Sequence, residues 1–446
     1  MSQPSSKKAE KIKLLSFKAP HMRTFHITWI TFFFCFFAWF GLAPMMKVVK
    51  DDLHLTKSQV GNIIIASISA TIFARLLMGW LCDKIGARKT YTILLLAGAI
   101  PVIMVGLATT YESFLIYRLA IGIIGASFVI TQYHTSAMFA PNVVGTANAI
   151  AGGWGNLGGG VTNMVMPLVF GAIMWMGYTS SQSWRLAMIV PGVILLILAF
   201  VYYKFTQDTP EGNFEDIKHH EKTEVERGSF KNAVLDIRTW ALALAYGACF
   251  GMEITFDNIA SLYFSENLGD SLTKFIGSTD KTDVLKWAGM LAGVFGLMNL
   301  FARAVGGIIA DAVGGRYGLK GKGLLLSGLL IFEGFGIVAF STTQDIWAAI
   351  VIMLGFAMFL KMANGTTFSI VPFVNKKSVG SVSGIVGAGG NIGGLLMGFL
   401  FKSENITYTQ AFSYIGFAVV AVGIIMAVVP FNKGHKQAVA HVPAGK

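Results

Sequence analysis

Charged residues are scarce in this chain. They make up 13% of its 446 residues, whereas a soluble globular protein carries about 25%, so a water-soluble enzyme is not expected. Cysteines are also few, and Cys35, Cys82 and Cys249 each lie inside an apolar stretch, which indicates neither a disulfide framework nor a metal site. The sequence contains no phosphate-binding loop, metal-ligand cluster or nucleophile motif. We therefore expect no cofactor, no metal and no ATP-driven reaction.

Hydrophobic residues, by contrast, make up 54% of the chain. A helix needs ~20 mostly apolar residues to cross a bilayer, and twelve such stretches together exceed half of the length. The sequence thus predicts an all-α membrane protein with twelve transmembrane helices. The predicted spans are 26–48, 59–82, 90–108, 113–138, 145–175, 186–205, 238–264, 287–310, 322–341, 346–370, 379–401 and 408–430.

The basic residues are concentrated on one side of this predicted topology. The formal net charge of +12 would suit nucleic-acid binding, but most Lys and Arg residues outside the spans fall in the terminal segments and in the segments on the same side. By the positive-inside rule both termini are cytoplasmic, as an even number of spans requires. We predict a multi-pass protein of the plasma membrane, the inner membrane in a bacterium, with lipid and not nucleic acid as its partner.

A motif recurs in the two halves of the chain, which indicates an internal repeat. At identical spacing, the recurring residues are Phe73, Ala74, Arg75, Gly79, Asp83 and Gly86, and Phe301, Ala302, Arg303, Gly307, Asp311 and Gly314. A glycine-rich stretch with a central asparagine also recurs, at 152–159 and 387–394. We predict a cytoplasmic segment, a six-helix half, a cytoplasmic linker, a second six-helix half and a cytoplasmic tail, at 1–25, 26–205, 206–237, 238–430 and 431–446.

The loop motif at 79–89, together with the two six-helix halves, resembles the major facilitator superfamily. The glycine-rich stretches, with Asn156 and Asn391 at their centres, resemble the paired signatures of the nitrate/nitrite porter family, and the resemblance covers nearly the whole chain. It implies the major facilitator fold and a secondary transporter that moves nitrate, or nitrate and nitrite, by alternating access. It also implies that Arg75 and Arg303 clamp the anion and that the two asparagines line its site.

The two arginines point to an anion site independently of the family. Arg75 lies eight residues before Asp83, and Arg303 eight before Asp311, so each is ~12 Å deep in an apolar core ~30 Å thick. No acidic residue is evident beside either arginine. A guanidinium keeps its charge and offers planar, paired donors, which suits a small planar oxyanion. The alternative is that each arginine belongs to a structural ion pair.

The other candidate site residues each have a structural alternative as well. An asparagine amide within an apolar helix needs partners, which are either the substrate and an adjoining arginine or a neighbouring helix. Four aromatic residues resemble family positions that border the anion, where rings exclude water: Tyr246, Phe250, Phe40 and Phe128. Any one Phe among the 35 in the chain is more often a core residue.

Two acidic residues, Glu253 and Asp257, share a predicted helix face with Tyr246 and Phe250. A carboxyl in an apolar helix is either paired or protonated, so we predict that Glu253 carries a proton with nitrate, with Asp257 or His134 assisting. The alternatives are a hydrated position near the outer mouth for Asp257 and a hydrogen-bonded core position for His134. Exchange of nitrate for nitrite, without a proton, is the other mode of coupling.

Charged residues at the predicted cytoplasmic ends of corresponding helices indicate a gate. We predict that Asp83 and Asp311, with Arg88 and Arg316 nearby, form a cytoplasmic latch in the outward-facing state. Farther along the second half, Glu333 and Lys361 either pair or face water.

Two other classes of function compete with transport. A membrane-embedded enzyme needs His, Asp or Glu clustered near one membrane face, and a nutrient sensor usually adds a signalling domain; the sequence shows neither. We therefore predict a monomeric transporter of nitrate, with another small anion as the alternative substrate.

Overall fold

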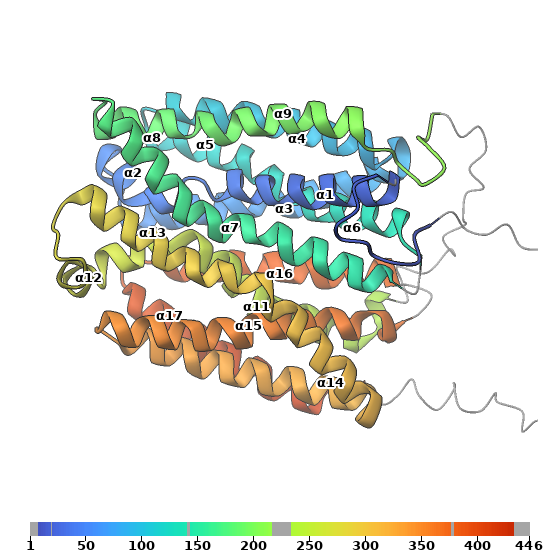
Figure 1. The fold of residues 1–446 in the computed structure, drawn as a ribbon. Coiled ribbons are helices and arrows are strands. Elements are labelled where there is room, and N and C mark those ends of the chain that lie inside the picture. Colours follow the sequence, from blue (N-terminus) through green and yellow to red (C-terminus); the bar gives the residue numbers. More distant parts are fainter. Residues whose placement is uncertain (1–7, 19, 141–142, 216–232, 376–378, 432–446) are drawn as a thin grey trace, which may run out of the picture.

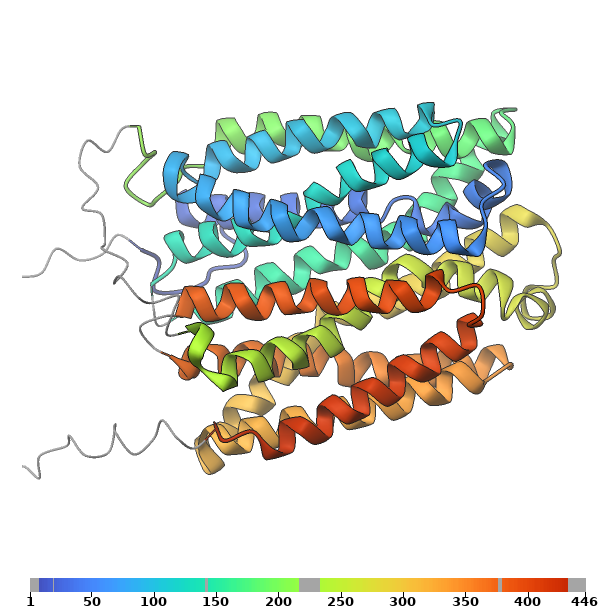
Figure 2. The same ribbon diagram turned by 180° about the vertical axis from the view of Figure 1, so that it is seen from behind.

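The regular structure is almost entirely helical. The computed structural model describes residues 8–18, 20–140, 143–215, 233–375 and 379–431. Within these ranges the only other regular structure consists of two isolated β-bridges, Ala9 with Phe139 and Thr209 with Gly212. The helices run side by side in one bundle, with the blue-to-green first half above the yellow-to-red second half (Figure 1). Figure 2 shows the same division from behind. The predicted all-α fold is confirmed.

The first half consists of long helices with short helical elements between them. They are α1 (Pro20–Trp39), η1 (Ala43–Met45), α2 (Met46–Asp52), α3 (Lys57–Ile85), α4 (Ala87–Met104), η2 (Val105–Leu107), α5 (Tyr111–Ile121), η3 (Gly122–Ala126), α6 (Ser127–Met138), α7 (Val144–Trp175), α8 (Ser180–Ala187) and α9 (Ile189–Phe205).

The second half repeats this plan with longer helices. They are α11 (Ile237–Glu266), α12 (Gly269–Ile276), α13 (Lys281–Leu297), η4 (Met298–Leu300), α14 (Ala302–Thr342), α15 (Ile346–Val374), α16 (Val379–Lys402) and α17 (Tyr408–Val428). We call the end where α2, α8 and α12 lie, at the left of Figure 1, the far end. The opposite end, where α1 begins and α9 and α17 end, is the terminal end.

Ten stretches of the described residues are long and apolar enough to cross a membrane. One of them, Lys281–Thr342, has 62 residues, which at ~1.5 Å per residue is far longer than one ~30 Å core requires. Its backbone leaves helical geometry at Gly318. The helix α11, which contains the acidic residues Glu253, Asp257 and Glu266, is not among the ten. Each of the twelve predicted segments falls on one helix or on consecutive helices, and the count of twelve crossings stays a prediction.

Threonine caps explain where several helices begin. Capping boxes start α3, α5, α8 and α17, with Thr56, Thr110, Thr179 and Thr407 as the N-caps. Each threonine hydroxyl accepts a hydrogen bond from the backbone N–H three residues on, which satisfies a donor that the helix itself leaves free. All four helices begin at the far end, so these caps stabilise the turns there.

The predicted loop motif forms the turn between α3 and α4. Gly86 has φ 87°, which favours glycine, and a Cβ there would lie 2.4 Å from Oδ1 of Asp208. The same Oδ1 accepts a hydrogen bond from the backbone N–H of Arg88 at 2.8 Å. The motif therefore ties this turn to the chain that follows α9.

The glycine-rich stretches bring helix backbones into direct contact. A Cβ on Gly158 of α7 would lie 1.9 Å from the carbonyl oxygen of Phe33 in α1, and one on Gly393 of α16 would lie 2.1 Å from that of Gly247 in α11. No side chain fits at such distances, so glycine at these two positions lets the helix backbones pack directly against each other. Close packing also fixes the two asparagines that lie within these stretches.

Candidate anion site

Arg75 lies in α3 with its guanidinium buried between the two halves. Its Nη1 donates to the carbonyl oxygen of Gly387 in α16 at 3.2 Å, and its Nε and Nη2 lie 3.5 Å from that of Gly125. The rings of Phe128 and Phe250 lie 5.4 and 6.0 Å from the guanidinium carbon. The described residues give this cation no acidic partner, so only carbonyl dipoles and ring faces offset its charge.

Arg303, at the equivalent position of the second half, has different surroundings. Its Nη2 donates to Oε2 of Glu253 in α11 at 2.9 Å, and its Nε is buried without a hydrogen-bond partner. The prediction that neither arginine has an acidic partner is therefore wrong for Arg303. The partner was missed because α11 is remote in sequence and comes together with α14 only in the folded bundle.

Glu253 is at the centre of a buried polar cluster. Its Oε2 accepts from Arg303 and, at 2.6 Å, from Nδ2 of Asn364. Its Oε1 accepts from Nδ2 of Asn299 at 2.8 Å and lies 2.7 Å from Nζ of Lys361. All five side chains are buried. Because a carboxylate offers about four lone-pair positions, these donors occupy the carboxylate of Glu253 completely.

Sequence reasoning did not find the two asparagines of this cluster, Asn299 and Asn364. The signal was present, because each is an amide within an apolar stretch, as the two predicted asparagines are. The suggested pairing of Lys361 with Glu333 is wrong, since Lys361 pairs with Glu253. Both carboxyl oxygens of Glu333 are buried without a hydrogen-bond partner.

Three of the four predicted aromatic residues gather near Arg75. The rings of Tyr246 and Phe250 are stacked, with centroids 4.9 Å apart. Phe368 of α15 meets Tyr246 edge-on at 5.0 Å and Phe128 at 6.5 Å. Phe368 was not predicted, because nothing in the sequence distinguishes it from other phenylalanines. Phe40 directly follows α1 and is buried against the rings of Phe36 and Trp39 in that helix, and its place at the site stays a prediction.

The two predicted asparagines are buried without partners. Asn156 in α7 is 2% exposed and Asn391 in α16 is 0% exposed. Neither the amide nitrogen nor the amide oxygen of either residue has a hydrogen-bond partner. More than ~90% of buried polar groups in proteins are hydrogen-bonded. These four amide atoms without partners lie at equivalent positions of the repeat, so they indicate a binding site where a ligand supplies the hydrogen bonds.

One turn before each asparagine lies a residue that contacts Arg75 or a ring beside it. One turn before the α7 asparagine, a Cβ on Gly152 would lie 3.7 Å from the ring of Phe128. One turn before the α16 asparagine, the carbonyl of Gly387 accepts the hydrogen bond from Arg75. Residues four apart share a helix face, so we expect both amides to lie near the Arg75 guanidinium, and their place at the site stays a prediction. Two cations, two unpartnered amides and an aromatic wall can bind a small oxyanion.

Comparison with known proteins identifies the family. The family model of the Major Facilitator Superfamily matches residues 28–398. The chain is 39% identical over 407 residues to the high affinity nitrate transporter 2.5 of Arabidopsis thaliana, an alignment that covers 90% of this chain and 78% of that protein. This chain belongs to the nitrate/nitrite porter family of the major facilitator superfamily. Membership makes it a transporter and not an enzyme.

Further relatives agree with this assignment. The nitrate/nitrite transporter NrtP of Nostoc punctiforme is 29% identical, over 87% of this chain and 88% of that one. Among solved structures, the xylose transporter XylE from E. coli, in a partially occluded inward open conformation, superposes with a TM-score of 0.68 at 13% identity, over 93% of this chain and 99% of that one. This structural likeness shows the major facilitator fold.

The predicted proton-coupling residues of this porter lie in different environments. Asp257, one turn from Glu253 in α11, is 3% exposed, and its Oδ1 has no hydrogen-bond partner; the alternative of a hydrated mouth position is wrong. His134 in α6 has both ring nitrogens engaged, at 2.5 Å from the hydroxyl of Tyr202 and 2.7 Å from the carbonyl of Gln207. The hydrogen-bonded core position considered for His134 matches these contacts.

The four predicted gate residues of this porter make no contact with one another in the part of the chain that the structure describes. Arg88 donates through Nη1 to the carbonyl oxygen of Tyr203, and Asp311 pairs with Lys322 at 2.6 Å, each within its own half. Arg316 is exposed, and the side chain of Asp83 is outside the described residues. The latch was predicted for the outward-facing state and stays a prediction.

Polar contacts close the far end of this porter. Lys50 of α2 pairs with Glu266 of α11 at 2.8 Å. Lys57 donates to the carbonyl oxygen of Ser403 at 2.7 Å, and the backbone N–H of Ser58 donates to Oε1 of Glu404 at 2.8 Å. A cavity of about 240 Å³ lies among these residues, lined by Lys50, Lys57, Glu266, Glu404, Ile406, Thr407 and Tyr408.

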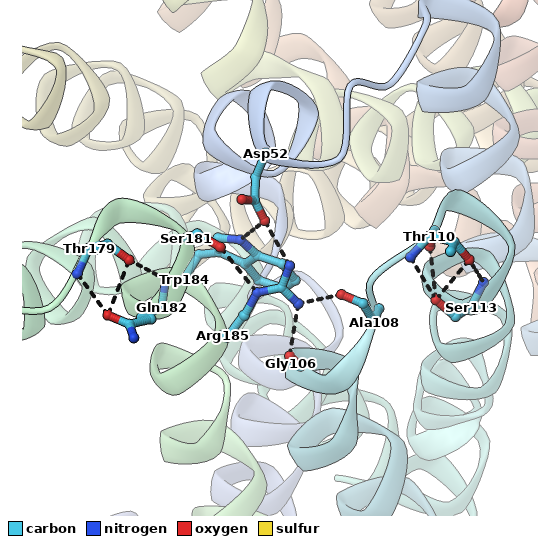
Figure 3. Close-up of polar contacts among 10 residues, drawn as sticks. All are labelled: Asp52, Gly106, Ala108, Thr110, Ser113, Thr179, Ser181, Gln182, Trp184 and Arg185. Carbon is cyan, nitrogen blue, oxygen red and sulfur yellow. Dashed lines mark hydrogen bonds and ion pairs between the residues drawn. The ribbon is translucent and has the colours of Figure 1, made fainter.

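A separate cluster fastens α2 to the first half (Figure 3). Arg185 of α8 donates to Oδ2 of Asp52 at 2.8 Å, to the carbonyl oxygen of Gly106 at 2.9 Å and to that of Ala108. The indole N–H of Trp184 donates to the same carboxylate oxygen at 3.0 Å. Because Asp52 ends α2, this cluster positions Lys50 for its ion pair with the second half.

Proposed function

We propose that this porter transports nitrate, and nitrite, by alternating access of its two halves around the site at Arg75 and Arg303. Two observations carry the proposal: the amides of Asn156 and Asn391 are buried without hydrogen-bond partners, and the buried cation Arg75 has no acidic partner, among the described residues. The names of the relatives, which include nitrate transporters and nitrate/nitrite transporters, support this choice of substrate.

The chemistry of the site matches a planar oxyanion. Nitrate is trigonal, with three oxygens and one negative charge, so it accepts from several donors in one plane. Arg75 supplies a charge that no carboxylate offsets, and Arg303 supplies its unpartnered Nε. The rings of Tyr246 and Phe250 exclude water, which strengthens each of these hydrogen bonds.

Transport of a lone anion into a cell needs a source of energy. An inward-negative potential opposes its entry by ~2.3 kcal/mol per 100 mV, and the sequence has no nucleotide-binding loop. We therefore propose proton-coupled uptake, in which co-moving protons supply the positive charge. One-for-one exchange of nitrate for nitrite is the alternative, because exchange moves no net charge.

Among the three candidates for the proton site, Asp257 has the most suitable surroundings. The carboxylate of Glu253 already accepts three hydrogen bonds and forms an ion pair with Lys361, and both nitrogens of His134 are engaged. Asp257 has a free carboxyl oxygen, and the charged groups that act on it are Lys361, Glu253 and Arg303. We propose Asp257 as the proton carrier, ahead of Glu253 and His134.

The closed far end corresponds to an inward-facing arrangement if the termini are cytoplasmic. The positive-inside rule supports that orientation, and the far end then faces outward. In this arrangement the contacts of Lys50 and Lys57 form the closed outer gate. The predicted latch of Asp83, Arg88, Asp311 and Arg316 would replace them in the opposite state.

Counterflow of labelled nitrate tests the substrate. Proteoliposomes that contain the purified porter and unlabelled nitrate should accumulate labelled nitrate, and external nitrite should compete with it, whereas formate, chlorate and sugars should compete poorly. Counterflow that a different anion inhibits more strongly than nitrite does would identify another substrate. Empty liposomes are the control for leakage.

Proton movement tests the coupling. We expect nitrate added to proteoliposomes that hold no nitrate or nitrite to make the external medium alkaline, and D257N to abolish this signal while it retains nitrate counterflow. E253Q should retain the signal. Uptake that strictly requires internal nitrite and does not depend on pH would show that the porter is an exchanger.

A further inference from the structure

The cluster around Glu253 brings more positive than negative charge to the second half. Arg303 and Lys361 both contact its single carboxylate, and all three side chains are buried. Lys361 also lies with its Nζ 4.2 Å from the ring centre of Phe295 and interacts electrostatically with Asp257. Without Glu253, these two buried cations would lack a counter-charge in contact with them.

The first half has no such counter-charge at its arginine. Arg75 contacts carbonyl oxygens and rings, so an entering anion receives the full attraction of its charge. At Arg303 the same anion meets a guanidinium that already donates to a carboxylate. A carboxylate and nitrate are both planar, negatively charged oxygen acceptors, so Glu253 and the substrate compete for the same cation.

We propose that Glu253 is a fixed counter-anion that lowers the affinity of the site for nitrate so that the anion can leave. This inference rests on the proposed function. Three uncompensated cations around one small anion would hold it strongly, and transport requires binding strong enough for entry yet weak enough for release. Glu253 offsets one of these charges, and Lys361, with Asn299 and Asn364, holds its carboxylate in position.

The proposal differs from a purely structural ion pair in the sign of its effect. If Glu253 only held Arg303 in place, its loss would weaken nitrate binding, because the guanidinium would lose its orientation. If Glu253 acts as a counter-anion, its loss strengthens nitrate binding and slows release, because attraction at the site increases. A paired substitution at Lys361 separates charge from shape, since it restores the net charge of the cluster.

The test measures nitrate binding to the full chain in lipid nanodiscs by calorimetry, with counterflow rates from proteoliposomes. We expect E253Q to lower the Kd for nitrate at least about fivefold and to lower both KM and kcat of transport. K361M should raise Kd by about the same factor, and the double variant E253Q/K361M should return it to within about twofold of wild type.

Several outcomes overturn the proposal. A folded E253Q that binds nitrate as wild type does, or more weakly, contradicts it. If E253Q does not fold, the double variant decides: a Kd near that of wild type supports the counter-charge, and a Kd at least about fivefold higher, or no folded protein, contradicts it. Failure of the proposed function is separate, because the wild-type protein itself would then bind no nitrate.

Discussion

Arg75 and Arg303 occupy equivalent positions in the two halves, yet only Arg303 has a carboxylate partner among the residues that the structure describes. Arg303 donates to Glu253 within its own half, whereas Arg75 donates to the carbonyl oxygen of Gly387 in the opposite half. The repeat in the sequence thus places two cations at symmetric positions, while the neighbouring helices determine which groups offset the charge of each. The two asparagines, by contrast, keep the symmetry, because Asn156 and Asn391 are both unpartnered.

This asymmetry has a consequence for the alternation of the halves. When the halves separate at the site, the contact of Arg75 with Gly387 must break, but the contact of Arg303 with Glu253 can persist. The environment of Arg75 therefore depends on the state of the transporter, and that of Arg303 depends on it much less. We expect substitutions at Arg75 to affect both binding and the movement of the halves.

The largest effect should come from the arginines themselves. We predict that R75K and R303K each raise the Kd for nitrate at least tenfold, although they keep the charge, because lysine is a point charge without a planar pair of donors; tenfold corresponds to ~1.4 kcal/mol. R75K should have the greater effect, because Arg75 has no carboxylate that shares its donors. Calorimetry on folded variants provides the measurement.

The substitution R23K controls for the chemistry of the exchange, since Arg23 lies at the terminal end, where its Nε donates to the carbonyl oxygen of Phe205. Wild-type binding in both R75K and R303K would contradict the clamp. Equal losses in the two variants would keep the clamp and contradict the asymmetry between the halves.

A smaller effect, on selectivity, should come from the two asparagines. We predict that N156A and N391A change the ratio of nitrate to nitrite affinity several-fold, because an amide that donates to one oxygen distinguishes anions with three and two oxygens. The symmetry of the two sites predicts changes of similar size. Competition of nitrite against labelled nitrate gives the ratio. An unchanged ratio, or a loss of folded protein in both variants, would assign the asparagines to packing.

The features of the fold that depend on the length of the apolar stretches and on the spacing of the glycines were predictable from the sequence. Each predicted span coincides with helices, and Gly158 and Gly393 of the two glycine-rich stretches pack against the backbone of a neighbouring helix. The gathering of Arg75, Tyr246, Phe250 and Phe128 also agrees with the prediction. These features depend on local pattern or on a recognisable motif.

The partners of buried polar groups were not predictable in the same way. Glu253 meets Arg303, Asn299, Lys361 and Asn364 from three other elements, α14, η4 and α15, and no local pattern relates Glu253 to them. Sequence reasoning consequently gave Glu253 the role of proton carrier, although its carboxylate has no free acceptor position. Contacts between remote helices depend on how the bundle assembles, which hydrophobic periodicity does not specify.

The smallest effect should come from the ion pair at the far end. Lys50 and Glu266 have side chains that are each 25% exposed, and such pairs contribute at most ~1 kcal/mol. Their pair joins the halves only while the far end is closed, so K50A removes stability from that state and from no other. We predict that K50A shifts the population toward the far-end-open state by at most about fivefold.

Spin labels at the exposed residues Asp51 and Asn405, one on each half at the far end, report this shift as a longer mean distance. High salt should produce part of the same shift in the wild-type protein, because salt screens an exposed pair, and little further shift in K50A. K50R, which keeps the charge, is the matched control.

R185A should shift the distance in the same direction as K50A. The reason is that Arg185 binds Asp52 and so holds α2, the helix that contains Lys50. If none of these changes alters the distance between the spin labels, the backbone contact of Gly61 with Lys402, and not the ion pair, keeps the far end closed.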